Sequence, residues 1–209
     1  GSLSFRDALT LVRKRGTYMQ EAVPVGVGAM AAIMGMDLER LEQICLEASG
    51  QTRVSPANLN APGQVVISGH ADAVDRAIAL AQERGARRAV KLAVSAPFHC
   101  ALMQPAADRL ASDLAATRFD DLRVPLVANV SASALSTGAE ARACLISQVT
   151  GAVRWEQSVR TLASMGVNRV LEVGPGRVLM GLIKRIESSI VCAPAGDAAS
   201  LSSAKEFAA

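Results

Sequence analysis

The sequence predicts an α/β protein in which one compact unit is inserted into a larger one. Over residues 25–95, apolar runs with strand or helix spacing follow one another in the order β-α-β-β-α-β. Before and after that segment, helical patterns outnumber the few apolar runs that could form strands. Half of the 209 residues are apolar, so both parts can bury a core.

The first element is expected to be a helix over residues 4–21, which Pro24 follows. The elements of the inserted unit then come in order: a strand over 28–34, a helix over 38–48 that Asp37 can cap, strands near 53–59 and 64–68, a helix over 71–84, and a strand over 87–94. Pro62-Gly63 between two extended runs is a hairpin signal. This order is typical of the ferredoxin-like fold.

The remainder of the chain is expected to hold more helices than strands. The helices are predicted over 103–116, 138–150, 155–165 and 176–188, and the strands over 124–130 and 168–173. So few strands among so many helices indicate an incomplete sheet. We therefore predict a large subdomain made of residues 1–22 and 97–209, with a ferredoxin-like small subdomain over 23–96 inserted into it.

Charge and composition exclude several classes of protein. The formal charge of +3 is too small for a nucleic-acid binder, although a mild basic excess can steer an acidic partner. No apolar run approaches the ~18 residues of a membrane span, and no signal peptide is visible. The four cysteines show no metal-binding spacing with the two histidines. We expect a cytoplasmic protein with reduced thiols, no metal and no bound cofactor.

The two histidines are the candidate bases. His70 follows Ser68-Gly69 at a strand end and is expected to be a surface or helix-capping residue. His99 lies in a loop between the two predicted subdomains, next to Pro97, where rigid elements on both sides can hold a base. The local sequence is equally compatible with an ordinary loop histidine at position 99.

Two further segments have alternative interpretations. Arg15 belongs to the run Arg13-Lys14-Arg15, which is typical of a solvated helix face. The specific alternative is a buried guanidinium that pairs with a substrate carboxylate. Glu172-Val-Gly-Pro-Gly176 stands at a strand–helix junction, but it lacks the lysine and the length of a phosphate-binding loop. We interpret it as a structural turn near a site.

Taken together, these segments resemble the malonyl-CoA:acyl-carrier-protein transacylases of fatty-acid synthesis and, more distantly, the acyltransferase domains of polyketide synthases. The resemblance extends to about residue 200, with the segments in the family's order and spacing. The matching segments are Arg15 to Ala22, Gly28 to Ile33, Asn58 to Gly69, Pro97 to Met103, Gln148 with Val153-Arg-Trp155, and Glu172 to Gly176.

The resemblance implies ping-pong transfer of malonyl from coenzyme A, through a serine ester, to the phosphopantetheine thiol of acyl carrier protein. His99 matches the catalytic base, and Gln148 matches a residue whose main-chain carbonyl holds that histidine. Arg15 matches the arginine that pairs with the free carboxylate of malonyl. Met19 matches a pocket-lining position, and Phe98 matches the bulky residue that favours malonyl over methylmalonyl. The implied large subdomain is α/β-hydrolase-like.

The sequence also departs from the family. It contains neither the family's Gly-Gln-Gly-Ser loop nor any Gly-x-Ser-x-Gly elbow for the nucleophile, and Ala152 replaces a common proline. We therefore expect the C-terminal portion of such an enzyme, inactive by itself. Two alternatives stay open: an acyltransferase of polyketide synthesis, and a non-catalytic module that docks acyl carrier protein through Lys14, Lys184 and Arg185.

Overall fold

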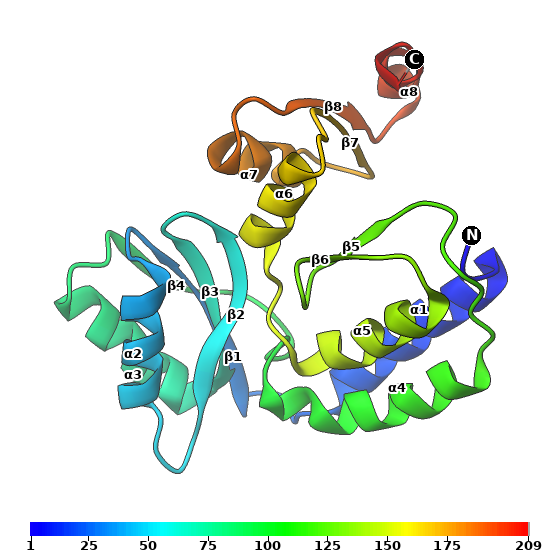
Figure 1. Cartoon of the computed structure of the whole chain (residues 1–209). Helices are drawn as coiled ribbons and strands as arrows, with labels where there is room; N and C mark the ends of the chain where they lie inside the picture. Colours follow the sequence, from blue (N-terminus) through cyan, green and yellow to red (C-terminus); the bar gives the residue numbers. More distant parts are fainter. Residues whose placement is uncertain (209) are drawn as a thin grey trace.

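The computed structural model describes residues 1–208, and it shows an α/β protein (Figure 1). Its elements, in chain order, are α1 (Phe5–Glu21), β1 (Gly28–Met34), α2 (Leu38–Ala48), β2 (Val54–Ala61), β3 (Gln64–His70), α3 (Ala71–Glu83), β4 (Arg88–Lys91), the 3-10 helix η1 (Ala101–Met103), α4 (Gln104–Ala116), β5 (Leu126–Ala128), β6 (Ser133–Leu135), α5 (Gly138–Thr150), α6 (Trp155–Ser164), β7 (Arg169–Val173), α7 (Val178–Ile186), β8 (Val191–Ala195) and α8 (Ala198–Ala208).

The segment from β1 to β4 has the β-α-β-β-α-β order that the sequence predicts. Its strands form one antiparallel sheet in the order β2-β3-β1-β4. Helices α2 and α3 cover one face of this sheet (Figure 1), and a core of buried aliphatic side chains fills the space between them. On the opposite face, Met30, Ala57 and Val66 pack with Phe98. The division of the chain at residues 22/23 and 96/97 stays a prediction.

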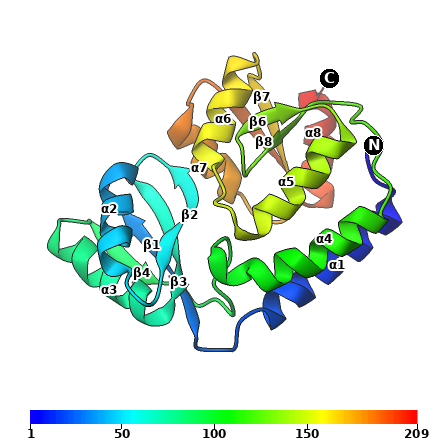
Figure 2. The same cartoon turned by 60° about the horizontal axis from the view of Figure 1, so that its bottom comes forward.

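The helices α1, α4 and α5 form a second group, in which α1 and α5 each pack against α4 (Figure 2). Leu11 and Met19 from α1 meet Leu110 and Leu114 from α4 in a common core. Apolar residues at helical spacing dictate this packing, because each helix must bury its apolar face. The loop that carries His99 runs between this group and the sheet.

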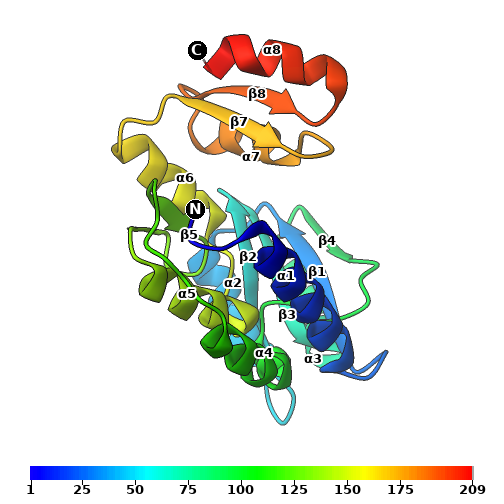
Figure 3. The same cartoon turned by 90° about the vertical axis from the view of Figure 1, so that its right-hand side faces the viewer.

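The C-terminal layer differs most from the sequence prediction. Strands β7 and β8 pair in parallel, with α7 on one side and α8 on the other (Figure 3). The elements β6, β8 and α8 were not predicted from the sequence. The strand β6 has only three residues, and β8 contains Pro194, which is tolerated there because β8 pairs with β7 alone in this sheet.

Two predicted strands are shorter than expected. The strand predicted over 124–130 is confined to β5, which follows Pro125 and gives way to a turn at 129–130. The strand predicted over 87–94 is confined to β4, because its pairing with β1 ends at Lys91. Leu92 N still donates to Met30 O at 2.8 Å, and beyond Leu92 the chain leaves the sheet and leads to the His99 loop.

None of the helices in residues 1–208 is long and apolar enough to cross a membrane. The four cysteines are free thiols, as the sequence predicts. Across the described part of the chain, histidine, cysteine, aspartate and glutamate side chains form no group that could hold a metal ion.

Candidate active site

His99 lies in a sharp turn between β4 and η1. Its backbone φ is +58°, in the left-handed region that residues with a side chain rarely adopt. Such strain persists only where the surrounding structure imposes it, and it gathers at functional sites. Two short-range bonds shape the turn: Phe98 N donates to Ala96 O at 3.1 Å, and the Cys100 thiol donates to Pro97 O at 3.1 Å.

The His99 ring is held by the main chain of α5. Its Nδ1 lies 3.0 Å from the carbonyl oxygen of Gln148. That carbonyl is available because α5 ends at Thr150 and Gly151 is extended, so the last carbonyls of the helix have no partner within it. A carbonyl can only accept, so Nδ1 must carry the proton. The other ring nitrogen, Nε2, is then left with a free lone pair.

Local bonds fix the end of α5 at which His99 is held. The Gln148 side-chain Nε2 donates to Gly151 O at 2.9 Å, and Gly151 N donates to Ser147 O at 2.8 Å. A Cβ added at Gly151 would lie 2.7 Å from both Ser147 O and a methyl group of Val130, so only glycine fits this position without displacing its neighbours. No local sequence signal indicates this role of Gly151.

Burial and charge both favour the neutral form of His99. Burial lowers the pKa of the ring below 6.5, and the positive charge of Arg15 lowers this pKa further. The bond to the Gln148 carbonyl and a second main-chain contact at Gly151 oppose these effects, but the net direction is downward. The ring therefore keeps its basic lone pair at pH values where a free histidine is protonated.

Arg15 differs from its neighbours on α1. Lys14 forms an ion pair with Asp113, whose second oxygen accepts from the Tyr18 hydroxyl at 2.7 Å. Arg15 is half-buried, and its guanidinium has no hydrogen-bonding or ion-pair partner among residues 1–208. Burial lowers its pKa from the usual value. The basic run thus contains a solvated, paired lysine and a half-buried arginine whose positive charge lowers the pKa of His99.

The structure brings His99, Gln148 and Arg15 together, and Phe98 lies beside them. Phe98 is half-buried and contacts both the helical core and the outer face of the sheet. Met19 is 3% exposed and packs in the helical core. A pocket-lining role for Met19 stays a prediction.

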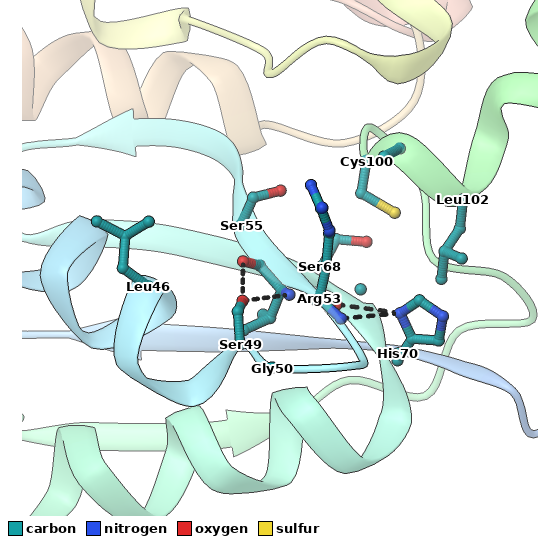
Figure 4. A pocket seen from close by; sticks show the side chains of 12 residues that line it. Leu46, Ser49, Gly50, Arg53, Ser55, Ser68, His70, Cys100 and Leu102 are labelled. Carbon is teal, nitrogen blue, oxygen red and sulfur yellow. Dashed lines mark hydrogen bonds between the residues drawn. The ribbon is translucent and has the colours of Figure 1, made fainter.

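His70 is the N-cap residue of α3, as its position before a helix indicated, but its side chain makes no capping bond. Its Nδ1 instead faces the main chain of Arg53, 3.1 Å from Arg53 N. Figure 4 shows His70 on the wall of a pocket of about 520 Å³ that Cys100 also lines.

The Glu172–Gly176 segment is a structural turn. The half of the turn after β7 contains two glycines with positive φ, Gly174 and Gly176. The buried Glu172 carboxylate accepts from Leu179 N at 3.0 Å and from Met180 N at 2.9 Å, which satisfies two free N–H groups in the first turn of α7. Of the basic residues proposed to dock a partner, Arg185 bonds the Gln64 side chain and Lys184 is exposed.

The sequence pattern of the acyl transferase domain matches residues 1–204. The chain belongs to the acyl transferase domain family. Among curated members, the malonyl CoA-acyl carrier protein transacylase of Escherichia coli K12 is 47% identical over 207 residues, which is 99% of this chain and 67% of that protein. The Bacillus subtilis protein of the same name is 49% identical over 187 residues, or 89% of this chain and 59% of that protein.

Solved acyl transferase structures have the same fold. The malonyl CoA-acyl carrier protein transacylase of Coxiella burnetii superposes with a TM-score of 0.95 at 44% identity, over 99% of this chain and 66% of that one. A malonyl-transacylase solved with its type II PKS acyl-carrier protein has a TM-score of 0.95 at 46% identity, over 99% of this chain and 67% of its own. The chain spans about two thirds of the length of these relatives.

Proposed function

We propose that this chain carries the base and the acyl-selecting arginine of a transferase that moves malonyl from coenzyme A to acyl carrier protein. The observation that carries the proposal is the 3.0 Å contact between His99 Nδ1 and the Gln148 carbonyl. The relatives named malonyl CoA-acyl carrier protein transacylase support the substrate and the partner. Malonyl is a thioester both on coenzyme A and on acyl carrier protein, so its transfer needs no resident cofactor.

His99 would act twice as a general base. Its Nε2 lone pair would take the proton of the nucleophile as it attacks the malonyl thioester, and the imidazolium would give that proton to the departing coenzyme A thiolate. The neutral ring would then take the proton of the phosphopantetheine thiol as it attacks the acyl-enzyme, and would return that proton to the nucleophile as its ester bond breaks. The Gln148 carbonyl would fill the place that a carboxylate has in a Ser-His-Asp triad. It lies at the negative end of the α5 dipole, which stabilises the imidazolium that forms.

Arg15 would select malonyl by its free carboxylate. A guanidinium that is partly desolvated and has no partner within residues 1–208 can pair with a carboxylate through two parallel bonds. An acetyl group would leave it unpaired, at a cost of about 1–3 kcal/mol or more for a charged group. Phe98, on the turn beside His99, would restrict branched acyl groups such as methylmalonyl. Met19 would support the pocket from the helical core.

The nucleophile is the part of the reaction for which this sequence offers no motif. No Gly-x-Ser-x-Gly occurs in the 209 residues. In the part of the chain that the structure describes, the His99 ring bonds a main-chain carbonyl, and no hydroxyl or thiol donates to it. We therefore propose that these 209 residues alone do not form an acyl-enzyme.

Covalent labelling tests the proposal at two levels. The 209-residue chain is incubated with radiolabelled malonyl-CoA. Neither its radioactivity after removal of free label nor its intact mass should show covalently bound malonyl. A chimera that adds the unmatched third of the E. coli relative should be labelled and should pass malonyl to acyl carrier protein. In the chimera, His99→Ala should slow transfer by about 10²–10⁴-fold. His70→Ala is the matched control and should leave the transfer rate unchanged. Labelling of the 209-residue chain, or full activity of the His99→Ala chimera, would overturn the corresponding part.

A second candidate carrier follows from one comparison. The chain is as similar to a malonyl-transacylase solved with a type II PKS acyl-carrier protein as it is to the fatty-acid enzymes. The chimera should therefore be assayed with carrier proteins of both kinds. A carrier protein of polyketide synthesis that accepts malonyl at a higher kcat/KM than the fatty-acid carrier would favour the second candidate.

A further inference from the structure

We propose that Gly28 and Cys100 clamp the turn at His99 and are positioning residues for this base. The inference rests on the proposed function of His99, and it concerns two residues that make no hydrogen bond to the ring. Gly28 opens β1, and Cys100 directly precedes η1. Both lie against Pro97, which stands two positions before His99.

The turn needs a clamp because its backbone is strained. His99 is one of two residues other than glycine with positive φ among residues 1–208. A residue with a Cβ returns to negative φ unless its neighbours prevent it. A return to negative φ would rotate the backbone at His99 and move the ring away from the Gln148 carbonyl, which lies 49 positions further along the chain. Whatever holds this φ therefore also holds the ring.

Cys100 closes the turn on one side of His99. Its thiol donates to Pro97 O at 3.1 Å. This bond joins residues three positions apart and so closes the turn around the strained His99. The side chain is buried, at 4% exposed, and burial raises the pKa of the thiol, which keeps it in the donating S–H form. The hydroxyl of Ser68, on β3, lies close enough to lower the pKa of this thiol, opposing burial. Figure 4 shows the Ser68 and Cys100 side chains on adjoining walls of one pocket.

Ser68 supports the same interpretation from the sheet. Its side chain is fully buried, and its Oγ lies near the Cys100 thiol but makes no hydrogen bond within residues 1–208. A buried hydroxyl without a partner is costly, so it marks a place where another requirement dominates. We interpret the placement of Ser68 as part of the same clamp, because its side chain and that of Cys100 line one pocket.

Gly28 fixes the other side of the turn. A Cβ at position 28 would lie 2.2 Å from Pro97 Cγ and 2.6 Å from Pro97 Cδ. The proline ring therefore sits directly on the glycine backbone, and a ring cannot swing aside as a flexible side chain can. Gly28 is itself paired with His70 in the sheet, so it cannot move away either. The start of β1 thus sets the position of Pro97, and the bond from the Cys100 thiol sets the distance between Pro97 and Cys100 on the two sides of His99.

The clamp is tested by ¹⁵N NMR of the 209-residue chain, which measures the tautomer of the His99 ring and its titration with pH. A His70→Gln variant assigns the signals, because the chain has two histidines. Cys100→Ala should reduce the Nδ1–H tautomer and move the titration midpoint toward 6.5. Gly28→Ala should do the same. Cys100→Ser keeps a donor at this position and should restore wild-type behaviour.

Two controls separate positioning from stability. Cys45→Ala removes an equally buried cysteine in the core of the β1–β4 unit, and should lower the thermal midpoint without moving the His99 titration. Gly181→Ala adds a Cβ within α7, where apart from the adjoining backbone of the helix no atom lies within 4 Å. It should leave the His99 titration unmoved and should not lower the thermal midpoint, because alanine favours a helix over glycine.

An unchanged tautomer and titration in Cys100→Ala, with a loss of thermal stability like that of Cys45→Ala, would overturn the clamp. If circular dichroism shows that Cys100→Ala does not fold, Gly28→Ala decides by the same two readouts. These readouts do not depend on catalysis. The clamp therefore fails in the NMR experiment, whereas the proposed function fails in the His99→Ala chimera.

Discussion

The role assigned to Gln148 makes an unusual prediction, because it concerns the main chain and not the side chain. Replacing Gln148 with alanine keeps the carbonyl that bonds His99 Nδ1. It removes the Nε2 group, which donates to Gly151 O at 2.9 Å and more weakly to Ala152 O at 3.4 Å. A neutral hydrogen bond contributes about 0.5–1.5 kcal/mol net, so the variant should lose about 1 kcal/mol of unfolding free energy. For a chain of this size that corresponds to a fall of about 2–4 °C in Tm.

The assay combines urea unfolding with NMR titration of His99. Gln148→Ala should lower the unfolding free energy while the Nδ1–H tautomer and the titration midpoint of His99 stay at their wild-type values. Gln104→Ala is a matched control: its Nε2 bonds the Asp108 carboxylate on the exposed face of α4. It should change the unfolding free energy by no more than about 0.5 kcal/mol. If Gln148→Ala instead abolished the tautomer preference, the side chain and not the carbonyl would hold His99.

Three further predictions follow from the same site and its scaffold. The folded-state pKa of His99 is lowered, so the unfolded state binds more protons between that pKa and about 6.5. The contribution of His99 to stability is therefore complete above pH 6.5 and is lost as the pH falls through the folded-state pKa. Urea unfolding from pH 8 to 5 should show a steeper loss of unfolding free energy in the wild type than in His99→Gln, and parallel curves would contradict this. Arg15→Gln should raise the His99 midpoint in NMR, because a positive charge that lowers the pKa of His99 is gone. In the wild type, malonate should raise the midpoint and acetamide, which carries no carboxylate, should not; an unmoved midpoint in the variant would show that the Arg15 charge does not act on the ring. Glu172→Ala should cost about 2–3 kcal/mol of unfolding free energy, because two N–H groups of α7 lose a charged acceptor, and a loss below about 0.5 kcal/mol would mean that water replaces the carboxylate.

Much of the fold follows from local signals in the sequence. The predicted bounds of β1, α2 and α5 coincide with the observed ones, because apolar periodicity and capping residues act over a few positions. Asp37 accepts from Arg40 N at 2.8 Å, as its place before an apolar helix predicts. The elements that were missed lack such signals: β8 is a short parallel strand that includes Pro194, and its pairing with β7 depends on tertiary contacts.

The candidate site is less accessible to sequence reasoning. Every residue has a carbonyl, so nothing in the local sequence distinguishes the carbonyl of Gln148 from its neighbours. The Gln148 carbonyl accepts a hydrogen bond from His99 because α5 ends two residues later and the turn at Pro97 brings the ring to this carbonyl. The left-handed backbone at His99 could not be predicted either, because histidine has no preference that requires it. Here the resemblance to a family supplied what periodicity and spacing could not.

The site concentrates features that a purely structural arrangement would avoid. His99 is strained, and Arg15 is half-buried with no partner within residues 1–208. Under the proposed function the two features are linked. The Arg15 charge lowers the pKa of His99 and so keeps the imidazole ring neutral, whereas a bound malonyl carboxylate would offset that charge and let the pKa rise. The base would then be strongest when the acyl group that carries the carboxylate is present, so that selection of malonyl and activation of the nucleophile would depend on the same guanidinium.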